Sequence, residues 1–164
     1  MIETIFNYHE IPKYVNSANS AIFIIPFAKE VCKGIGYDIG CGKKEWAFPG
    51  SIPIDPLITD NYDAMKLPDG EVDYIFSSHT LEHLDSWVNA IRYWTTKIKS
   101  GGVLFFYLPS YNKISWRPWI NWSHKHILHP NEIKDFLEFE NKYRKIYVSG
   151  IDLNYSFAIM CEKK

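Results

Sequence analysis

The stretch Gly36-Tyr37-Asp38-Ile39-Gly40-Cys41-Gly42 joins a short apolar run with an acidic residue to two glycines separated by one residue. This pattern predicts a buried parallel strand that runs into a turn of the backbone. Glycines at such a turn let a ligand approach the main chain closely, because no side chain stands in the way. In open α/β sheets, ligands bind at the carboxyl ends of the strands. The stretch therefore predicts the floor of a ligand-binding site.

The composition and charge of the chain indicate one globular domain and limit its partners. With 164 residues, 46% hydrophobic and 23% charged, the sequence is long enough to bury a core. A formal net charge of −1 argues against a duplex nucleic-acid partner, which would require a basic face. Three scattered cysteines are too few for a disulfide framework or a four-cysteine zinc site. We expect a single domain over residues 1–164, with residues 1–16 as an irregular arm.

The sequence indicates neither secretion nor membrane insertion. Its first residues lack a positively charged segment followed by an apolar one, so no secretory signal is expected. The longest apolar run, residues 21–28, contains Pro26 and is far shorter than a bilayer requires. We therefore expect a cytoplasmic protein without a membrane span.

Strands and helices are expected to alternate, which indicates a mainly parallel α/β sheet. The apolar runs predict strands at 35–39, 51–55, 72–77, 103–108, 143–149 and 154–161. The last two are joined by a short segment around Gly150, so we expect an antiparallel hairpin. Helical spacing predicts helices within 17–33, from Leu81 to Ile98, and over 131–140. Pro26 would kink the first helix or begin a shorter one over 26–33, while Gly101 and Gly102 would end the second.

The connection after the second strand is unusually short. Only about sixteen residues separate Asp55 from the strand at 72–77, which is too few for a full crossover helix and a full strand. We expect a trimmed connection, with a short third strand near Tyr62 and Asp63.

Asp55 supplies the second part of the ligand site. It ends the predicted second strand and follows the glycine turn by about a dozen residues. An acid at this place can accept two hydrogen bonds from the hydroxyl groups of a ribose. A dinucleotide-binding fold would more typically show G-x-G-x-x-G, whereas this chain has D-x-G-x-G followed by two lysines. A tight strand-to-helix turn without a ligand is the alternative interpretation.

Several segments resemble the motifs of class I S-adenosylmethionine-dependent methyltransferases, in the family's order. Residues 37–42 resemble the first motif, Asp55 falls at the position of the ribose-binding acid, and residues 63–68 resemble the stretch that meets the adenine. Residues 72–84 resemble the fourth strand and its loop. Residues 98–104 resemble the approach to the fifth strand, with a serine in place of the family's proline.

The resemblance implies a Rossmann-like fold, S-adenosyl-L-methionine as cofactor and a methyl-transfer activity. The expected sheet has seven strands, is mainly parallel with a C-terminal antiparallel hairpin, and is trimmed between strands two and four. The implied cofactor-binding residues are Asp38, Gly40, Cys41, Gly42, Asp55, Asp63, Ala64, Ser77 and Ser78. Lys44 departs from the pattern, since the family has a small residue there, and would turn outward or contact the cofactor's carboxylate.

The segment His79-Thr80-Leu81-Glu82-His83 has a competing interpretation, because H-x-x-E-H is the inverted zinc-protease pattern. On a helix, His79 and His83 would share a face and could bind zinc, with Glu82 activating water. The strand predicted to end just before Ser78 instead places His79 in a loop. Under the methyltransferase resemblance, Ser78 and His79 face the transferred methyl group and no metal ligand is assigned.

Residues 111–129 carry three tryptophans and three histidines. A loop so rich in aromatic residues is costly to leave exposed. It could form a lid over the acceptor, with His124 or His126 as a base, or a small second core at the edge of the sheet.

These observations favour methyl transfer to an oxygen or nitrogen of a small-molecule or carbohydrate acceptor, with His79, His124 and His126 as candidate catalytic residues. Two alternatives stay open. One is a non-catalytic cofactor-binding or scaffold domain, and the other is a zinc hydrolase using His79, Glu82 and His83.

Overall fold

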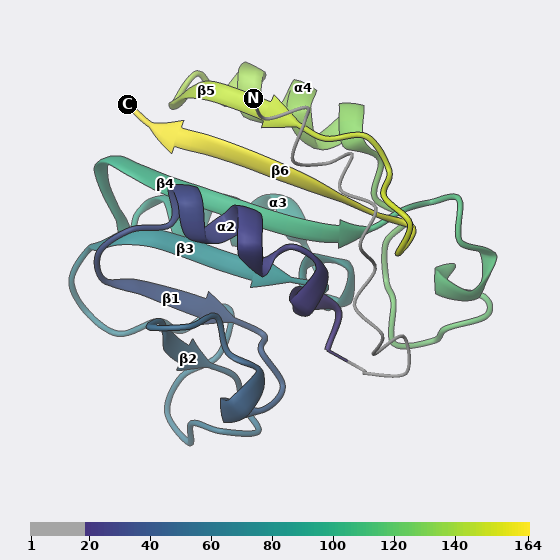
Figure 1. The fold of residues 1–164 in the computed structure, drawn as a ribbon, viewed down its shortest axis with the longest axis horizontal. Helices are drawn as coiled ribbons and strands as arrows, with labels where there is room; N and C mark the ends of the chain where they lie inside the picture. Colours follow the sequence, from purple (N-terminus) through teal and green to yellow (C-terminus); the bar gives the residue numbers. More distant parts are fainter. Residues whose placement is uncertain (1–18) are drawn as a thin grey trace.

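The computed structural model describes residues 19–164 and places a six-stranded sheet at their centre, in the order β2-β1-β3-β4-β6-β5 (Figure 1). The strands are β1 (Gly36–Ile39), β2 (Ile52–Ile54), β3 (Val72–Ser78), β4 (Ile98–Pro109), β5 (Tyr143–Val148) and β6 (Ser156–Lys163). The first four pair in parallel, whereas β6 is antiparallel to both β4 and β5. The predicted parallel sheet and C-terminal hairpin are therefore confirmed. The arm expected at residues 1–16 lies outside the described residues.

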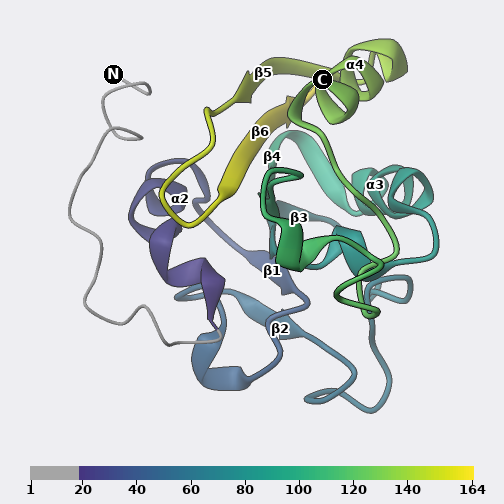
Figure 2. The same cartoon turned by 90° about the vertical axis from the view of Figure 1, so that its right-hand side faces the viewer.

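One face of the sheet is covered by the 3₁₀ turn η1 (Ser20–Phe23) and helix α2 (Ile25–Val31) (Figure 2). Pro26 lies in the first turn of α2, where its missing N–H costs no hydrogen bond, so the shorter of the two predicted helices is the one that forms. Side chains of alternate strand residues pack on this face together with Phe48 and the helix. The strand residues are Tyr74, Phe76, Phe105, Tyr107, Ala158 and Met160.

The opposite face is covered by α3 (Trp87–Thr95) and α4 (Pro130–Glu140) (Figure 2). Its core takes the intervening strand residues, as the two-residue period of a strand requires. These include Ile39, Ile75, Leu104, Phe106, Leu108, Phe157 and Ile159. Long strands buried on both faces explain why residues 103–108 read as a continuous apolar run.

The third strand expected near Tyr62 and Asp63 does not form, and the sheet of the described chain has six strands rather than seven. Asp63 and Lys66 instead make an isolated antiparallel bridge, which closes a tight turn. A 3₁₀ turn, η2 (Lys44–Trp46), replaces a full helix between β1 and β2. The trimmed connection was predicted correctly, but Asp63 and Lys66 pair with each other rather than with a strand of the sheet.

The helix expected from Leu81 to Ile98 is also wrong in its bounds. Residues 81–83 form the 3₁₀ turn η3 (Leu81–His83), and α3 begins only after Ser86, whose side chain caps the helix by accepting from the Asn89 amide. Ile98 belongs to β4. Gly101 and Gly102 therefore lie inside β4 rather than ending a helix; Gly101 has a φ of +80°, and the β3–β4 register shifts close by, between Val72 and Tyr74.

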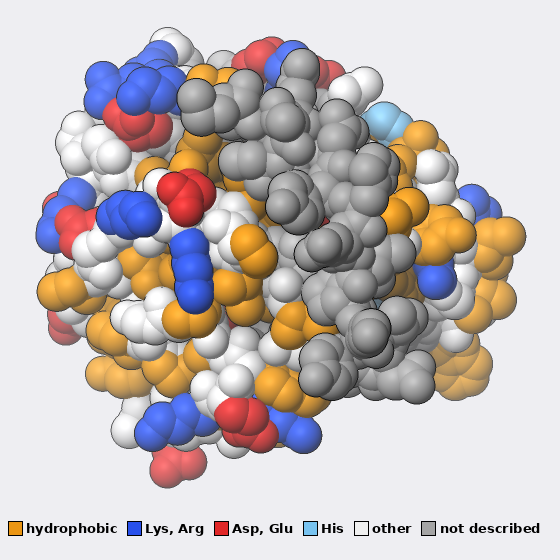
Figure 3. Space-filling model, viewed as in Figure 1, with side chains coloured by type: hydrophobic (Ala, Val, Ile, Leu, Met, Phe, Trp, Pro, Cys, Tyr) orange, Lys and Arg blue, Asp and Glu red, His pale blue; other side chains and the backbone are white. Residues whose placement is uncertain are grey.

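The surface carries charges of both signs without a single-sign patch on the face shown in Figure 3. Hydrophobic side chains gather at the side where the loop between β4 and α4 extends, a loop that contains the 3₁₀ turn η4 (Ile114–Trp116). Among the helices of residues 19–164, none has the length and apolar character needed to cross a membrane.

Candidate functional site

A cleft of about 370 Å³ opens at the carboxyl ends of β1, β2 and β3. This is the edge at which parallel α/β sheets bind ligands. Its walls are Gly40, Ile54, Asp55, Pro56, Asp63, Ala64, Met65, His79, Thr80, His83 and Leu84. Five of the twelve predicted site residues line it: Gly40, Asp55, Asp63, Ala64 and His79.

Gly40 forms the floor of the cleft for two physical reasons. Its φ of +81° lies in the left-handed region, which favours glycine. A Cβ atom at this position would also lie only 2.0 Å from Oγ1 of Thr80, so no side chain fits. The Gly40 amide donates to the Ile54 carbonyl at 2.8 Å, which ties the turn to the end of β2.

Asp55 stands at the end of β2 and is 7% exposed. Its Oδ2 accepts a hydrogen bond from the Gly42 amide at 2.8 Å, and its Oδ1 accepts from the Leu57 amide at 2.9 Å. Each carboxylate oxygen has a second lone pair, so both can still accept from a ligand. The arrangement fixes an acceptor group at the wall of the cleft.

Asp63 and Ala64 lie in the tight turn that forms the outer wall. Asp63 Oδ1 accepts from the Met65 amide at 2.7 Å, and the Ala64 carbonyl accepts from Nε1 of Trp94 at 2.6 Å. Trp94 is fully buried on α3. The turn is therefore anchored to the core by a side chain that the sequence analysis did not single out.

Asp38 lies outside the cleft and points into the core beside α2. It is 1% exposed, and its Oδ2 accepts from the Phe48 amide at 2.7 Å, while Oδ1 has no hydrogen-bond partner in the described part of the chain. Burial raises the pKa of this carboxyl to about 7, against the opposing effect of the Phe48 hydrogen bond. Asp38 thus supports the glycine turn from the side of the core, and it does not contact the cleft.

The remaining predicted cofactor residues also lie outside the cleft walls. The Ser77 hydroxyl is buried and donates to the Ile39 carbonyl at 2.9 Å, and the Ser78 hydroxyl bonds with that of Ser20 at 3.2 Å. Cys41 is half-buried, and burial raises the pKa of its thiol to about 12. Gly42 has a φ of +72° and contributes its amide to Asp55. Lys44 is exposed, as expected of a side chain that turns outward.

His79 lies at the end of β3 with a φ of +51°, an unusual conformation for a residue with a side chain. Its amide donates to the Tyr107 carbonyl at 2.8 Å, and its Nε2 lies 2.9 Å from the Ser156 hydroxyl. Burial lowers the pKa of the imidazole to about 3, with smaller contributions from His124 and His83. Because His79 precedes η3, the helix that the zinc-protease pattern requires over residues 79–83 does not form.

His124 and His126 come from the loop between β4 and α4 and do not line the 370 Å³ cleft. The Nδ1 of His124 lies 2.6 Å from the Trp116 carbonyl, and the Nε2 of His126 lies 2.8 Å from the Leu84 carbonyl. Both border a cavity of only about 10 Å³, room for roughly one water molecule. The loop is thus held against η3. Trp119 and Trp122, at 60% and 88% exposure, are not part of a second core.

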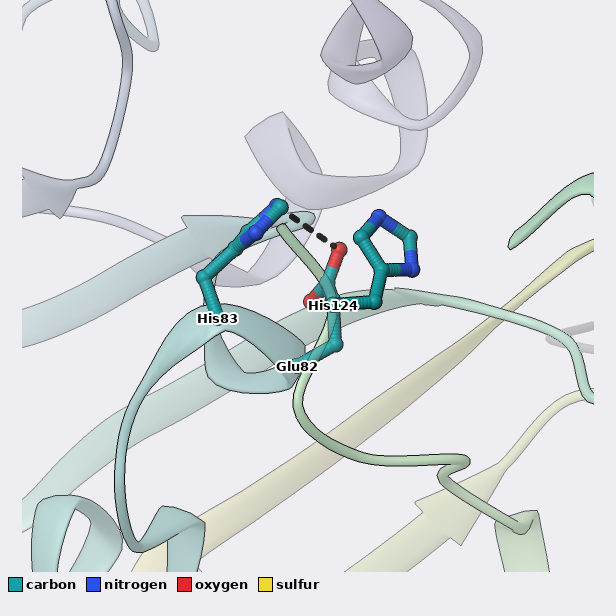
Figure 4. A group of neighbouring side chains, drawn as sticks. All are labelled: Glu82, His83 and His124. Carbon is teal, nitrogen blue, oxygen red and sulfur yellow. Dashed lines mark ion pairs between the residues drawn. The ribbon is translucent and has the colours of Figure 1, made fainter. Parts of the chain in front are cut away.

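Glu82 is the residue whose surroundings were least foreseen. Its side chain is fully buried, and burial raises the pKa of the carboxyl to about 8. His83 lies beside it on η3, and His124 reaches it from the loop (Figure 4). Thr80 was also missed: its hydroxyl donates to the Ile39 carbonyl at 3.1 Å and packs against Gly40.

Comparison with known families agrees with this geometry. A model of the methyltransferase domain matches residues 17–138, well over half of the chain, so the protein belongs to the methyltransferase-domain family. No curated protein matched the sequence. The fold is that of the class I enzymes, and the protein is an S-adenosylmethionine-dependent methyltransferase.

Solved structures share the fold at low sequence identity. A methyltransferase from Archaeoglobus fulgidus is 20% identical with a TM-score of 0.58, covering 87% of this chain and 91% of its own. A putative methyltransferase of Haloferax volcanii, solved with the activator Trm112, is 11% identical with a TM-score of 0.68, covering 88% of each chain. The N-methyltransferase NodS of Bradyrhizobium japonicum, bound to S-adenosyl-L-homocysteine, is 12% identical with a TM-score of 0.60, covering 99% of this chain and 96% of its own.

The residues of the cleft fit the family's cofactor. The volume lies within the range of small-molecule sites. Gly40 keeps the floor free of side-chain atoms, and Asp55 retains lone pairs for two ribose hydroxyls. Asp63 and Ala64, the residues that the resemblance assigns to the adenine, also line the cleft.

Proposed function

We propose that the chain transfers a methyl group from S-adenosyl-L-methionine to an oxygen or nitrogen atom of a small-molecule or carbohydrate acceptor. The observation that carries the proposal is the cleft at the carboxyl ends of β1 and β2, floored by Gly40 and walled by Asp55. In this proposal Asp55 accepts from the ribose hydroxyls, and the turn at Asp63 and Ala64 borders the adenine. The cofactor, when bound, supplies an electrophilic methyl group on a sulfonium sulfur.

The chain's own contribution is positioning. Alignment of two reactants can account for roughly 7–11 kcal/mol of barrier reduction, and transfer of a methyl group leaves a neutral sulfide that needs little further stabilisation. His79, Thr80 and His83 form the wall of the cleft nearest β3, where the acceptor would enter. A base is required only if the acceptor loses a proton in the step, as a hydroxyl would.

A small or carbohydrate acceptor is supported by one surface feature and by one solved relative. Trp119 and Trp122 expose most of their side chains on the loop that packs against η3, and flat aromatic faces of this kind suit sugars or planar rings. One solved relative, an O-methyltransferase of Planctomyces limnophilus with 14% identity, was crystallised with apigenin.

Calorimetric titration with S-adenosylhomocysteine tests the cofactor site. We expect one ligand per chain and at least a roughly tenfold loss of affinity in Asp55→Ala, because two hydrogen bonds to a charged acceptor are removed. The matched control is Asp60→Ala, which changes an exposed acid nearby that does not line the cleft. Absence of binding at millimolar ligand, or equal affinity in the two variants, would sink the proposal.

A screen with labelled cofactor against sugars, small acids and cell extracts then separates an enzyme from a scaffold. Turnover on any acceptor supports the enzyme. Tight cofactor binding without turnover across the screen would favour the non-catalytic alternative.

A further inference from the structure

The carboxylate of Glu82 is fully buried, and neither of its oxygens has a hydrogen-bond partner among residues 19–164. A buried carboxylate in this condition is costly, since it has lost its hydration without gaining donors. Three imidazole rings surround it, those of His79, His83 and His124. The nitrogen atoms nearest to Glu82 Oε1 are Nδ1 of His79 and Nε2 of His83, each at 3.7 Å. These distances are too long for hydrogen bonds.

The hydrogen bonds of His83 fix which of its nitrogen atoms carries a proton. Its Nδ1 lies 2.8 Å from the carbonyl oxygen of Ser123, and a carbonyl can only accept. Nδ1 therefore holds the proton, and the neutral ring presents an unprotonated Nε2. This lone pair is the one that faces Glu82 (Figure 4).

His124 is oriented in the same way from the other side. Its Nδ1 lies 2.6 Å from the Trp116 carbonyl, which leaves Nε2 unprotonated in the neutral ring. The rings of His83 and His124 are nearly perpendicular, with their centres 4.6 Å apart. One ligand atom from each of Glu82, His83 and His124 lies within 4.8 Å of the others.

His79 adds a fourth acceptor. The Ser156 hydroxyl donates to the Asn154 carbonyl, so its oxygen accepts from Nε2 of His79. The neutral ring then turns an unprotonated Nδ1 toward Glu82. These unprotonated nitrogen atoms face a carboxylate that has no donor in the described structure, which is a repulsive arrangement until a cation lies between them.

We propose that Glu82, His83 and His124 bind a divalent transition-metal ion. Two histidines and a carboxylate form a ligand set typical of zinc, with one coordination position left open. Ligands about 2.1 Å from a tetrahedral metal lie about 3.4 Å apart. The 3.7 Å between Glu82 Oε1 and Nε2 of His83 is close to this spacing, and the ligand atom of His124 lies within 4.8 Å of both residues. The Ser123 and Trp116 carbonyls that orient the two rings are the outer partners usual for metal-bound histidines.

The position of the site indicates what the metal would do. Glu82 and His83 belong to η3, whereas His124 belongs to the loop that carries the exposed tryptophans. The metal would therefore clamp this loop to the turn that walls the cleft. His83 and His79 also line the cleft, so an oxygen atom of an acceptor could reach the open coordination position. The site does not depend on the cofactor proposal.

Zinc titration of the untagged, chelator-treated chain tests the site, with a chromogenic chelator as competitor. We expect one Zn²⁺ per chain and a rise in thermal unfolding temperature on binding. Glu82→Gln and His124→Ala should each lower the zinc affinity by at least about tenfold, since even loss of an outer partner costs that much. His129→Asn is the control, because it replaces a histidine of the same loop region while keeping a side chain that can cap α4.

Circular dichroism and S-adenosylhomocysteine binding show whether each variant is folded. A wild-type chain that binds less than one Zn²⁺ would overturn the proposal, as would equal zinc affinity in the wild type, Glu82→Gln and His124→Ala. Cofactor binding by the metal-free chain keeps this outcome distinct from failure of the proposed function.

Discussion

The carboxylate of Asp55 accepts a hydrogen bond from the Gly42 amide at 2.8 Å, joining the end of β2 to the glycine turn that follows β1. Its other oxygen accepts from the Leu57 amide. One side chain therefore holds together two of the segments that border the cleft, before any ligand is bound.

Asp55→Asn should destabilise the ligand-free protein. An asparagine side chain has one oxygen, so it can accept from only one of the two amides and turns an NH₂ group toward the other. We expect the free energy of unfolding to fall by about 1–3 kcal/mol in urea titrations. A variant as stable as the wild type would show that the two amides find other partners.

Gly40→Ala should be more harmful than Gly50→Ala. Both glycines have positive φ, +81° and +86°, so both substitutions carry backbone strain of order 1 kcal/mol. A Cβ at position 50 meets nothing within 4 Å, whereas one at position 40 meets Thr80 at 2.0 Å. The free energy of unfolding should therefore fall by about 1–3 kcal/mol more in Gly40→Ala than in Gly50→Ala. This difference measures the steric cost of the clash with Thr80, because the backbone strain is similar in both variants. Equal losses would contradict the close packing of Thr80.

Trp94→Phe should weaken cofactor binding through the turn at Ala64. The substitution removes the hydrogen bond to the Ala64 carbonyl while keeping an aromatic ring in the core. If the loss of this hydrogen bond costs about 1 kcal/mol of binding free energy, the affinity for S-adenosylhomocysteine falls roughly fivefold. Tyr93→Phe is the matched control, because it removes the bond to the Leu67 amide, and Leu67 does not line the cleft. An equal drop in affinity for both variants would assign the effect to α3 as a whole.

The stability of the protein should depend on pH through Asp38. Its folded-state pKa, about 7, lies above the unfolded value of about 4, so the folded state binds more protons between these limits. The contribution of this group to stability is therefore present below about pH 4 and is lost as the pH rises through about 7. Asp38→Asn keeps an oxygen for the Phe48 amide but does not titrate.

Denaturant titrations from about pH 5 to pH 8 give the measurement. The wild type should lose stability relative to Asp38→Asn across this interval. Substitution of the exposed Asp60 by asparagine provides the comparison for general charge effects. Parallel curves for wild type and Asp38→Asn would show that Asp38 ionises as freely in the folded chain as in the unfolded one.

The local parts of the fold could be predicted from the sequence. The strand and turn at residues 36–42 and the acid at Asp55 depend on residue types a few positions apart, and the structure brings Gly40 and Asp55 to one cleft. The prediction of one helix from Leu81 to Ile98 was wrong. The side chain of Leu81 is buried, but this residue belongs to a 3₁₀ turn, and the buried Ile98 belongs to a strand. Helical spacing cannot reveal the break that the left-handed backbone of His79 and the Ser86 cap introduce.

Long-range features could not be predicted in the same way. His124 lies beside Glu82 only because the loop after β4 folds back and the Lys125 and His126 amides donate to the Glu82 carbonyl. No pattern within a few residues encodes that approach. The absence of the third strand could not be predicted either. Asp63 and Lys66 pair their backbone groups with each other in a turn, so this segment does not pair with β2.

The absent third strand leaves β2 as one of the two edge strands of the described sheet, and an edge strand invites pairing with other chains. The Ile54 carbonyl points inward to the Gly40 amide, so the backbone of Pro53, one residue earlier, points outward. A proline there has no N–H to offer a neighbouring molecule. With only three residues in the strand, this border of the sheet is a poor template for aggregation, and a Pro53→Val substitution would make it a better one.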